Sequence, residues 1–233
     1  MTSVVDTGTG DDDDGLTDPL TRRTRRLTTQ SIRRVFKVTY KDNQGTGAFY
    51  EVLDTSNCKR SLFITCNYVA PTNSLQDIME FMKIVFPEDN SLLELKIEHL
   101  LCCWTWKCYC IDATVIELST AGEKYLRDLN VTFLQVSDAN VKDLVSILEI
   151  SDGQSTKGYI KEVKESKVYY HKETAAGSVG APLIDQNCRA FAIHRTVDPT
   201  NDDKLSTEYP DRPLMAIALR EIIKAFFNES ETL

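Results

Sequence analysis

Short runs of alternating hydrophobic and polar residues dominate the chain from Val35 onward. Such runs are typical of β-strands that bury one face. The last strongly patterned segment differs, because apolar residues between Met215 and Phe227 recur at helical spacing. Many short strands followed by one amphipathic helix predict paired β-barrels or a β-sandwich. The expected strands are 35–40, 48–53, 61–66, 93–97, 101–109, 113–118, 131–136, 145–149, 158–163, 167–170, 181–184 and 189–194, with a helix or loop at 121–129.

The first 33 residues have a different composition. They contain few apolar residues, an aspartate run at 11–14 and four arginines among threonines at 22–26. This composition predicts a disordered, charged tail over 1–33 and a folded region over 34–233. An arginine cluster beside serine and threonine also fits a localisation signal, a kinase site or a docking arm.

Charge and hydropathy narrow the classes of partner. The net charge of -8 argues against a nucleic-acid partner, because phosphate contacts need clustered lysine and arginine. No apolar run approaches the roughly 20 residues that a bilayer crossing needs, and the chain opens without the layout of a secretory signal. We therefore expect no membrane partner and an intracellular location, cytoplasmic or nuclear.

Seven cysteines raise the question of a metal site. Four of them crowd into one stretch, at Cys102, Cys103, Cys108 and Cys110. Zinc motifs usually separate two ligand pairs by a dozen or more residues, whereas this stretch alternates with aromatic residues as a half-buried strand does. The sequence therefore favours thiols packed as small hydrophobic groups, with no metal and no cofactor.

Four segments resemble one family. The segment Gly-Ser-Val-Gly-Ala-Pro-Leu-Ile from Gly177 resembles the signature around the nucleophile of trypsin-like serine proteases. The segments from Phe63 and Ile111 resemble the strands that carry that family's histidine and aspartate, and Gly-Thr-Gly from Gly45 resembles its glycine-containing strand. The resemblance implies an all-β fold of two antiparallel β-barrels, at about 34–120 and 130–213, with a C-terminal α-helix at about 214–228.

Two of the three catalytic positions implied by the resemblance are substituted. They are occupied by Tyr68, Asp112 and Val179, so that only the aspartate remains. Tyrosine is a poor base at neutral pH and valine has no nucleophilic atom. These substitutions predict a protein that is not an enzyme but a pseudoprotease, a scaffold that binds a protein or peptide partner, with backbone N–H groups of Gly177 and Val179 outlining an oxyanion hole. We also expect the Tyr68 hydroxyl to donate a hydrogen bond to the buried Asp112 carboxylate.

An alternative keeps the protease activity. Ser178 would be the nucleophile, with His171 or His194 as the base and Asp112 to orient it. The segments around Thr174 and His194 further resemble viral 3C-like and intracellular trypsin-like proteases, in which such residues line the pocket for a glutamine or glutamate side chain. His194 fits a satisfied core histidine equally well.

Overall fold

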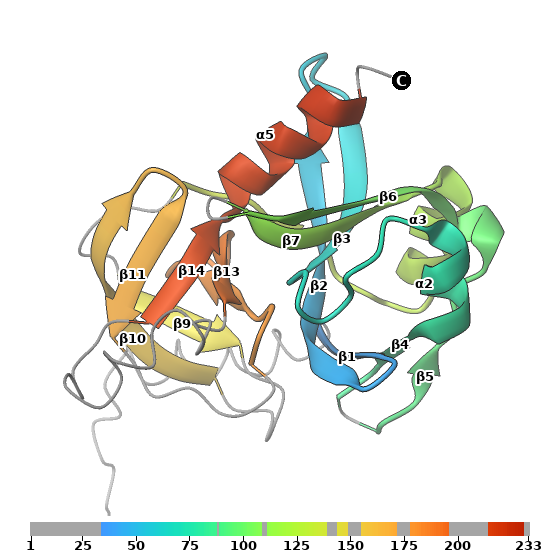
Figure 1. Cartoon of the computed structure of the whole chain (residues 1–233), viewed down its shortest axis with the longest axis horizontal. Coiled ribbons are helices and arrows are strands. Elements are labelled where there is room, and N and C mark those ends of the chain that lie inside the picture. Colours follow the sequence, from blue (N-terminus) through green and yellow to red (C-terminus); the bar gives the residue numbers. More distant parts are fainter. Residues whose placement is uncertain are drawn as a thin grey trace, which may run out of the picture.

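The fold is built from two sheets of mainly antiparallel strands, which lie side by side in Figure 1. The computed structural model describes residues 34–87, 89–108, 111–138, 144–148, 155–171, 178–195 and 214–230. The tail predicted over 1–33 lies outside these residues.

The first sheet has eight strands, in the order β5-β4-β1-β2-β3-β7-β6, with β8 parallel to β2. Its aromatic core explains why alternation marks these segments, because Phe36, Phe49 and Phe63 all point inward and their neighbouring rings lie 5.1 and 4.8 Å apart. The elements of this half are β1 (Val35–Tyr40), β2 (Asn43–Leu53), β3 (Lys59–Thr65), α2 (Leu75–Phe81), β4 (Met82–Val85), β5 (Leu92–Leu93), η2 (Ile97–His99), β6 (Leu100–Lys107), β7 (Asp112–Leu118), α3 (Thr120–Asp128) and β8 (Leu134–Gln135).

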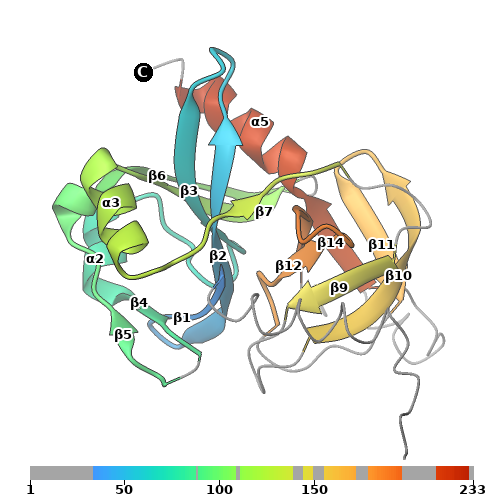
Figure 2. The same ribbon diagram turned by 180° about the vertical axis from the view of Figure 1, so that it is seen from behind.

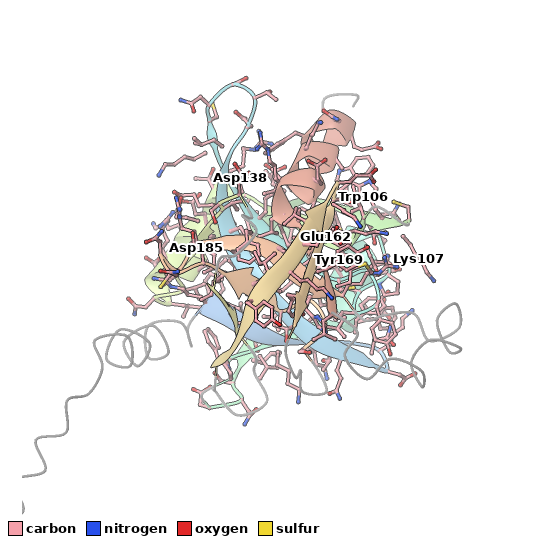
Figure 3. All side chains as sticks on the ribbon, turned by 90° about the vertical axis from the view of Figure 1, so that its left-hand side faces the viewer. Trp106, Lys107, Asp138, Glu162, Tyr169 and Asp185 are labelled. Carbon is pink, nitrogen blue, oxygen red and sulfur yellow. The ribbon has the colours of Figure 1, made fainter. Side chains whose placement is uncertain are left out.

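The second sheet closes into a barrel in the order β10-β11-β14-β13-β12-β9. On its outer face, Glu162 and Tyr169 are cross-strand neighbours on β10 and β11 (Figure 3). The elements of this half are β9 (Leu144–Leu148), β10 (Ser155–Lys164), β11 (Lys167–His171), β12 (Pro182–Ile184), β13 (Ala190–Arg195), β14 (Leu214–Ala218) and the helix α5 (Leu219–Ser230).

One hydrophobic cluster joins the two sheets and α5. It contains Tyr50 and Leu62 from the first sheet, Ile193 and Ile217 from the second, and Phe226 from α5, all fully buried. Figures 1 and 2 show the helix beside the β2–β3 hairpin, across the top of the junction. Because burial of this cluster needs all three parts, it fixes one sheet against the other. The predicted two-barrel fold with a C-terminal helix is confirmed.

The helix predicted from residue 214 begins five residues later. Leu214–Ala218 form β14, whose residues pair with β11 on one side and β13 on the other. The strand closes the second barrel, and this long-range pairing outweighs the local helical spacing of the apolar residues. The strands predicted over 93–97 and 131–136 are likewise shorter, since only Leu92–Leu93 and Leu134–Gln135 form strands and Val136 adds a single bridge to Ala190.

The cysteines of β6 pack as the alternation predicts. Cys103 is buried in the first core, whereas Cys102 is half-buried on the opposite face, with its thiol 3.5 Å from the Glu117 carboxylate. Burial raises the pKa of Cys103 to about 12, and burial followed by the charge of Glu117 raises that of Cys102 to about 11. Both thiols therefore stay protonated, and poorly nucleophilic, at neutral pH.

Alkylation rates should distinguish the buried thiols from the exposed ones. We expect iodoacetamide at pH 8 to modify the exposed Cys58 and Cys108 at least about tenfold faster than Cys66, Cys102 or Cys103, because the thiolate is the reactive species. Mass spectrometry of timed samples measures the rates, and alkylation in urea is the control. Equal rates for Cys103 and Cys58 in the folded protein would contradict the packing.

Candidate functional site

The first part of the site is a tight turn at the end of β3. The N–H groups of Val69 and Ala70 both donate to the Cys66 carbonyl, at 3.0 and 3.3 Å, and so reverse the chain. Val69 points into the core, whereas the Tyr68 side chain is 56% exposed. The position that the resemblance assigns to the catalytic histidine thus carries a phenol that faces solvent.

The second part is the turn at Val179, which docks on β2. The Thr46 N–H donates to the Val179 carbonyl at 2.7 Å. A Cβ atom at Gly45 would lie 2.5 Å from both the Val179 oxygen and a methyl group of Val69, so these three residues meet with no space for a side chain. The turns that carry Tyr68 and Val179 therefore lie against the same point of β2.

The third part is an ion pair between the sheets. The Arg195 Nε of β13 lies 2.8 Å from Oδ2 of the buried Asp112, the first residue of β7. The Nε–H is not well aligned for a hydrogen bond, so the contact is chiefly electrostatic. The expected bond from Tyr68 to Asp112 is therefore wrong, because Arg195 supplies the charge that balances this carboxylate while the Tyr68 ring turns to solvent.

Cys66 lies beside this ion pair. Burial, and then the negative charge of Asp112, raises the pKa of its thiol far above the ordinary value. A buried, protonated thiol next to a carboxylate is not an activated nucleophile. Cys66 therefore adds packing, and no reactive group, to the centre of the site.

His194 has a partner that the sequence analysis missed. The Tyr170 hydroxyl lies 2.5 Å from His194 Nδ1, and both side chains are buried in the second barrel. A signal was present, because Val168 and Tyr170 alternate inward on β11 and a buried tyrosine needs a partner for its hydroxyl. The hydrogen bond fixes the orientation of the imidazole.

Ser178 lies close to His194 along the backbone. The Gly180 N–H donates to the His194 carbonyl, and the His194 N–H donates to the Ala181 carbonyl, each at 2.8 Å. The Ser178 side chain is only 4% exposed. The hydrogen bond described for the His194 ring goes to Tyr170 and not to this hydroxyl. Thr174, Gly177 and the side chain of His171 lie outside the described residues.

Neither a metal-binding cluster nor a membrane-spanning helix occurs in the described part of the chain. Within the described ranges, no three histidine, cysteine, aspartate or glutamate side chains gather closely enough to hold a metal ion. No helix in the same part of the chain combines the length and the apolar character that a bilayer crossing requires.

Comparisons with known proteins agree on the architecture. No protein-family model matches the chain, and no curated protein matches its sequence. Among solved structures, it is similar to an inactive form of Rv3671c from M. tuberculosis H37Rv that carries a serine-to-alanine mutation (TM-score 0.56, 13% identity, covering 89% of this chain and 91% of that one). It is also similar to the serine protease domain of the Sesbania mosaic virus polyprotein (TM-score 0.55, 11% identity, 82% and 90% covered) and to Deg5 (0.52, 12%, 89% and 93%).

These comparisons overturn one expectation. The two substitutions at positions 68 and 179 predicted that the chain is not an enzyme. That prediction is wrong, because structures that share its fold include the Rv3671c protease and the serine protease domain of Sesbania mosaic virus, and no finding shows that this chain is inactive or acts as a scaffold. Loss of the two residue types removes the familiar triad, but it does not exclude reaction at another hydroxyl.

The similarity to these solved structures extends over both sheets. Each match spans more than four fifths of this chain, so it includes both sheets and not one sheet alone. At identities of 11 to 13%, this likeness rests on architecture rather than on shared residues. The chain therefore has the two-barrel fold of the chymotrypsin-like, or trypsin-like, serine proteases.

Proposed function

We propose that the chain is a serine endopeptidase that binds a peptide where its two barrels meet and cleaves it with Ser178. A histidine, His194 or His171, is the base. The observation that carries the proposal is the hydrogen bond between Tyr170 and His194, because it orients the imidazole. Two backbone hydrogen bonds join His194 to the turn that carries Ser178, so a histidine and a serine hydroxyl, the parts of a catalytic pair, belong to neighbouring segments.

The chemistry would follow acyl transfer. The Ser178 oxygen would attack the peptide carbonyl carbon while its proton passes to the histidine nitrogen, which then protonates the departing amine. Water would hydrolyse the resulting ester in a second, equivalent cycle. Because Ser178 is buried in the free protein, the turn must open when substrate binds, and reaction with small probes should be slow.

The tautomer of His194 decides its role. If Nδ1–H donates to the Tyr170 oxygen, Nε2 is left with a lone pair and His194 can act as the base. If the Tyr170 hydroxyl donates to Nδ1, then Nε2 carries a hydrogen that can donate to a glutamine or glutamate side chain of the substrate, and His171 is the base. Nitrogen-15 NMR of the imidazole distinguishes the two states.

Labelling with a fluorophosphonate probe tests the proposal. We expect slow labelling of the natural protein, and Ser178→Ala should lower the labelling rate by at least about 100-fold, because it removes the attacking oxygen. Peptide mapping by mass spectrometry should place the label on Ser178. Val179→Ala is the matched control, since it changes the neighbouring side chain without removing an oxygen, and its rate should stay within about threefold of the natural rate.

Two labelling results would overturn the proposed reaction at Ser178. A natural protein that takes no label, while a variant with a rebuilt histidine and serine does, would overturn reaction at Ser178. A label that survives Ser178→Ala would do so as well. Labelling of Ser178 in a His194→Gln variant would assign the base to His171 and reserve His194 for binding the substrate.

A further inference from the structure

Among the described residues, four arginines each contact a carboxylate that is at most 15% exposed, and Arg195 is the one whose own side chain is also mostly buried. Arg60 bridges Glu117 and Asp54, at 2.5 and 3.4 Å. Arg127 bridges Glu51 and Glu123, at 3.0 and 2.8 Å. Arg189 and Arg195 each contact a single carboxylate, those of Asp185 and Asp112, but Arg189 is half exposed whereas Arg195 is mostly buried.

The unused part of the Arg195 guanidinium points to a ligand. Only its Nε is sealed from solvent, and the Nε atom is the one that faces Asp112. The two Nη groups make no hydrogen bond or ion pair with any described residue, although the side chain is only 17% exposed. A planar fork of N–H donors that is mostly buried but open at its tip matches the two oxygens of a carboxylate.

The position of this fork places it in the proposed substrate site. Arg195 directly follows His194 on β13, and its partner Asp112 stands at the position of the family's catalytic aspartate. Successive residues of a strand point to opposite faces, so His194 faces Tyr170 within the second barrel whereas Arg195 reaches across the junction to Asp112 of the first sheet. An extended peptide advances about 3.3 Å per residue, so one or two residues span neighbouring subsites of this kind.

We propose that Arg195 binds a carboxylate of the peptide ligand. Along the peptide, this carboxylate lies within two residues of the peptide side chain that faces His194. The inference rests on the proposed function for the location of the peptide, but it does not depend on cleavage. Arg195 would then bridge two carboxylates, as Arg60 and Arg127 do within the fold. The carboxylate is either an acidic side chain or the free C-terminus of a cleaved product.

Binding to the full chain carrying Ser178→Ala tests the site without any reaction. The probes are acetylated six-residue peptide amides with one central glutamine and either glutamate or glutamine at one neighbouring position, and titration calorimetry measures Kd. We expect at least one glutamate peptide to bind about tenfold or more tightly than its glutamine counterpart, with a preference that weakens as salt rises. A peptide that ends in glutamine with a free carboxylate, compared with its amide, tests the product as the source.

Variants at the ion pair assign the effect to Arg195. Arg195→Gln together with Asp112→Asn removes both charges, so no buried charge is left unpaired, and it should abolish the preference for glutamate. Arg195→Lys keeps the charge without the fork and should reduce the preference severalfold. Arg189→Gln is the matched control, because this half-exposed arginine lies on the same barrel and pairs with the mostly buried Asp185, and it should leave the preference unchanged.

The outcomes separate this inference from the proposed function. Equal affinities for all carboxylate and amide pairs would overturn it, and so would a preference that persists after both charges are removed. A glutamate preference that depends on Arg195, in a protein whose Ser178 takes no fluorophosphonate label, would support the carboxylate site and reject only the proposed reaction.

Discussion

Rebuilding the familiar triad should require three substitutions rather than two. The change of Tyr68→His and Val179→Ser supplies a base and a nucleophile at the positions that the resemblance assigns. The structure, however, pairs Asp112 with Arg195 at 2.8 Å, so the new imidazole would have to compete for its orienting carboxylate. We expect the double variant to react weakly with a fluorophosphonate, and the addition of Arg195→Ser to raise the labelling rate on the order of 10²- to 10⁴-fold. Loss of the aspartate's pairing with histidine costs trypsin-like enzymes about 10⁴-fold.

The rates should be measured at saturating probe with the Ser178→Ala change in every variant, so that only the rebuilt site is counted. Arg189→Ser in place of Arg195→Ser is the matched control, because it removes an equivalent charge that is paired with another mostly buried carboxylate, that of Asp185. Equal rates for the double and triple variants would show that Arg195 does not hold the carboxylate in solution.

Replacing Gly180 with alanine should destabilise the fold more than most single substitutions. Gly180 has a φ of +85°, and a Cβ there would lie 2.2 Å from the carbonyl oxygen of Thr46, a backbone atom that cannot turn aside. We expect a loss of about 3 kcal/mol or more in the free energy of unfolding, from the left-handed backbone and from this overlap together. Urea denaturation followed by circular dichroism measures the change.

Val179→Ala provides the comparison for Gly180. It truncates a half-buried neighbour on the same turn and should cost only about 1 kcal/mol. If Gly180→Ala unfolded at the same urea concentration as the natural protein, the close approach of this turn to β2 would be wrong.

The sequence predicts strands well where one face is buried, and poorly where pairing partners decide. The segments 35–40 and 113–118 match β1 and β7 within a residue, because the polar Lys37 and Thr39 mark the outward face of β1 and a largely apolar run marks β7, which is buried on both faces. The segment Leu214–Ala218 looks helical by spacing alone, yet its ladder to β11 and β13 makes it a strand. Such long-range pairing leaves no local signal.

The residues of the candidate site are likewise predicted in part from local sequence, whereas their partners are set by long-range contacts. The resemblance identifies Asp112 and His194 from motifs, but neither of their partners, Arg195 and Tyr170, lies in a motif. Each partner comes from a different strand and reaches its target only through the curvature of the sheets. A single sequence therefore indicates which groups need a partner, and only the fold shows which residue meets that need.

The shared cluster beneath α5 bears on how the chain is completed during synthesis. The helix follows every strand in chain order, yet Phe226 packs in one cluster with Tyr50 and Leu62, from strands made some 160 residues earlier. Until Leu219–Ser230 have left the ribosome, the helix does not cover that face of the first sheet, and an exposed apolar face is prone to aggregation. The first sheet therefore reaches its final packing only after α5 has emerged, however early its own strands have paired.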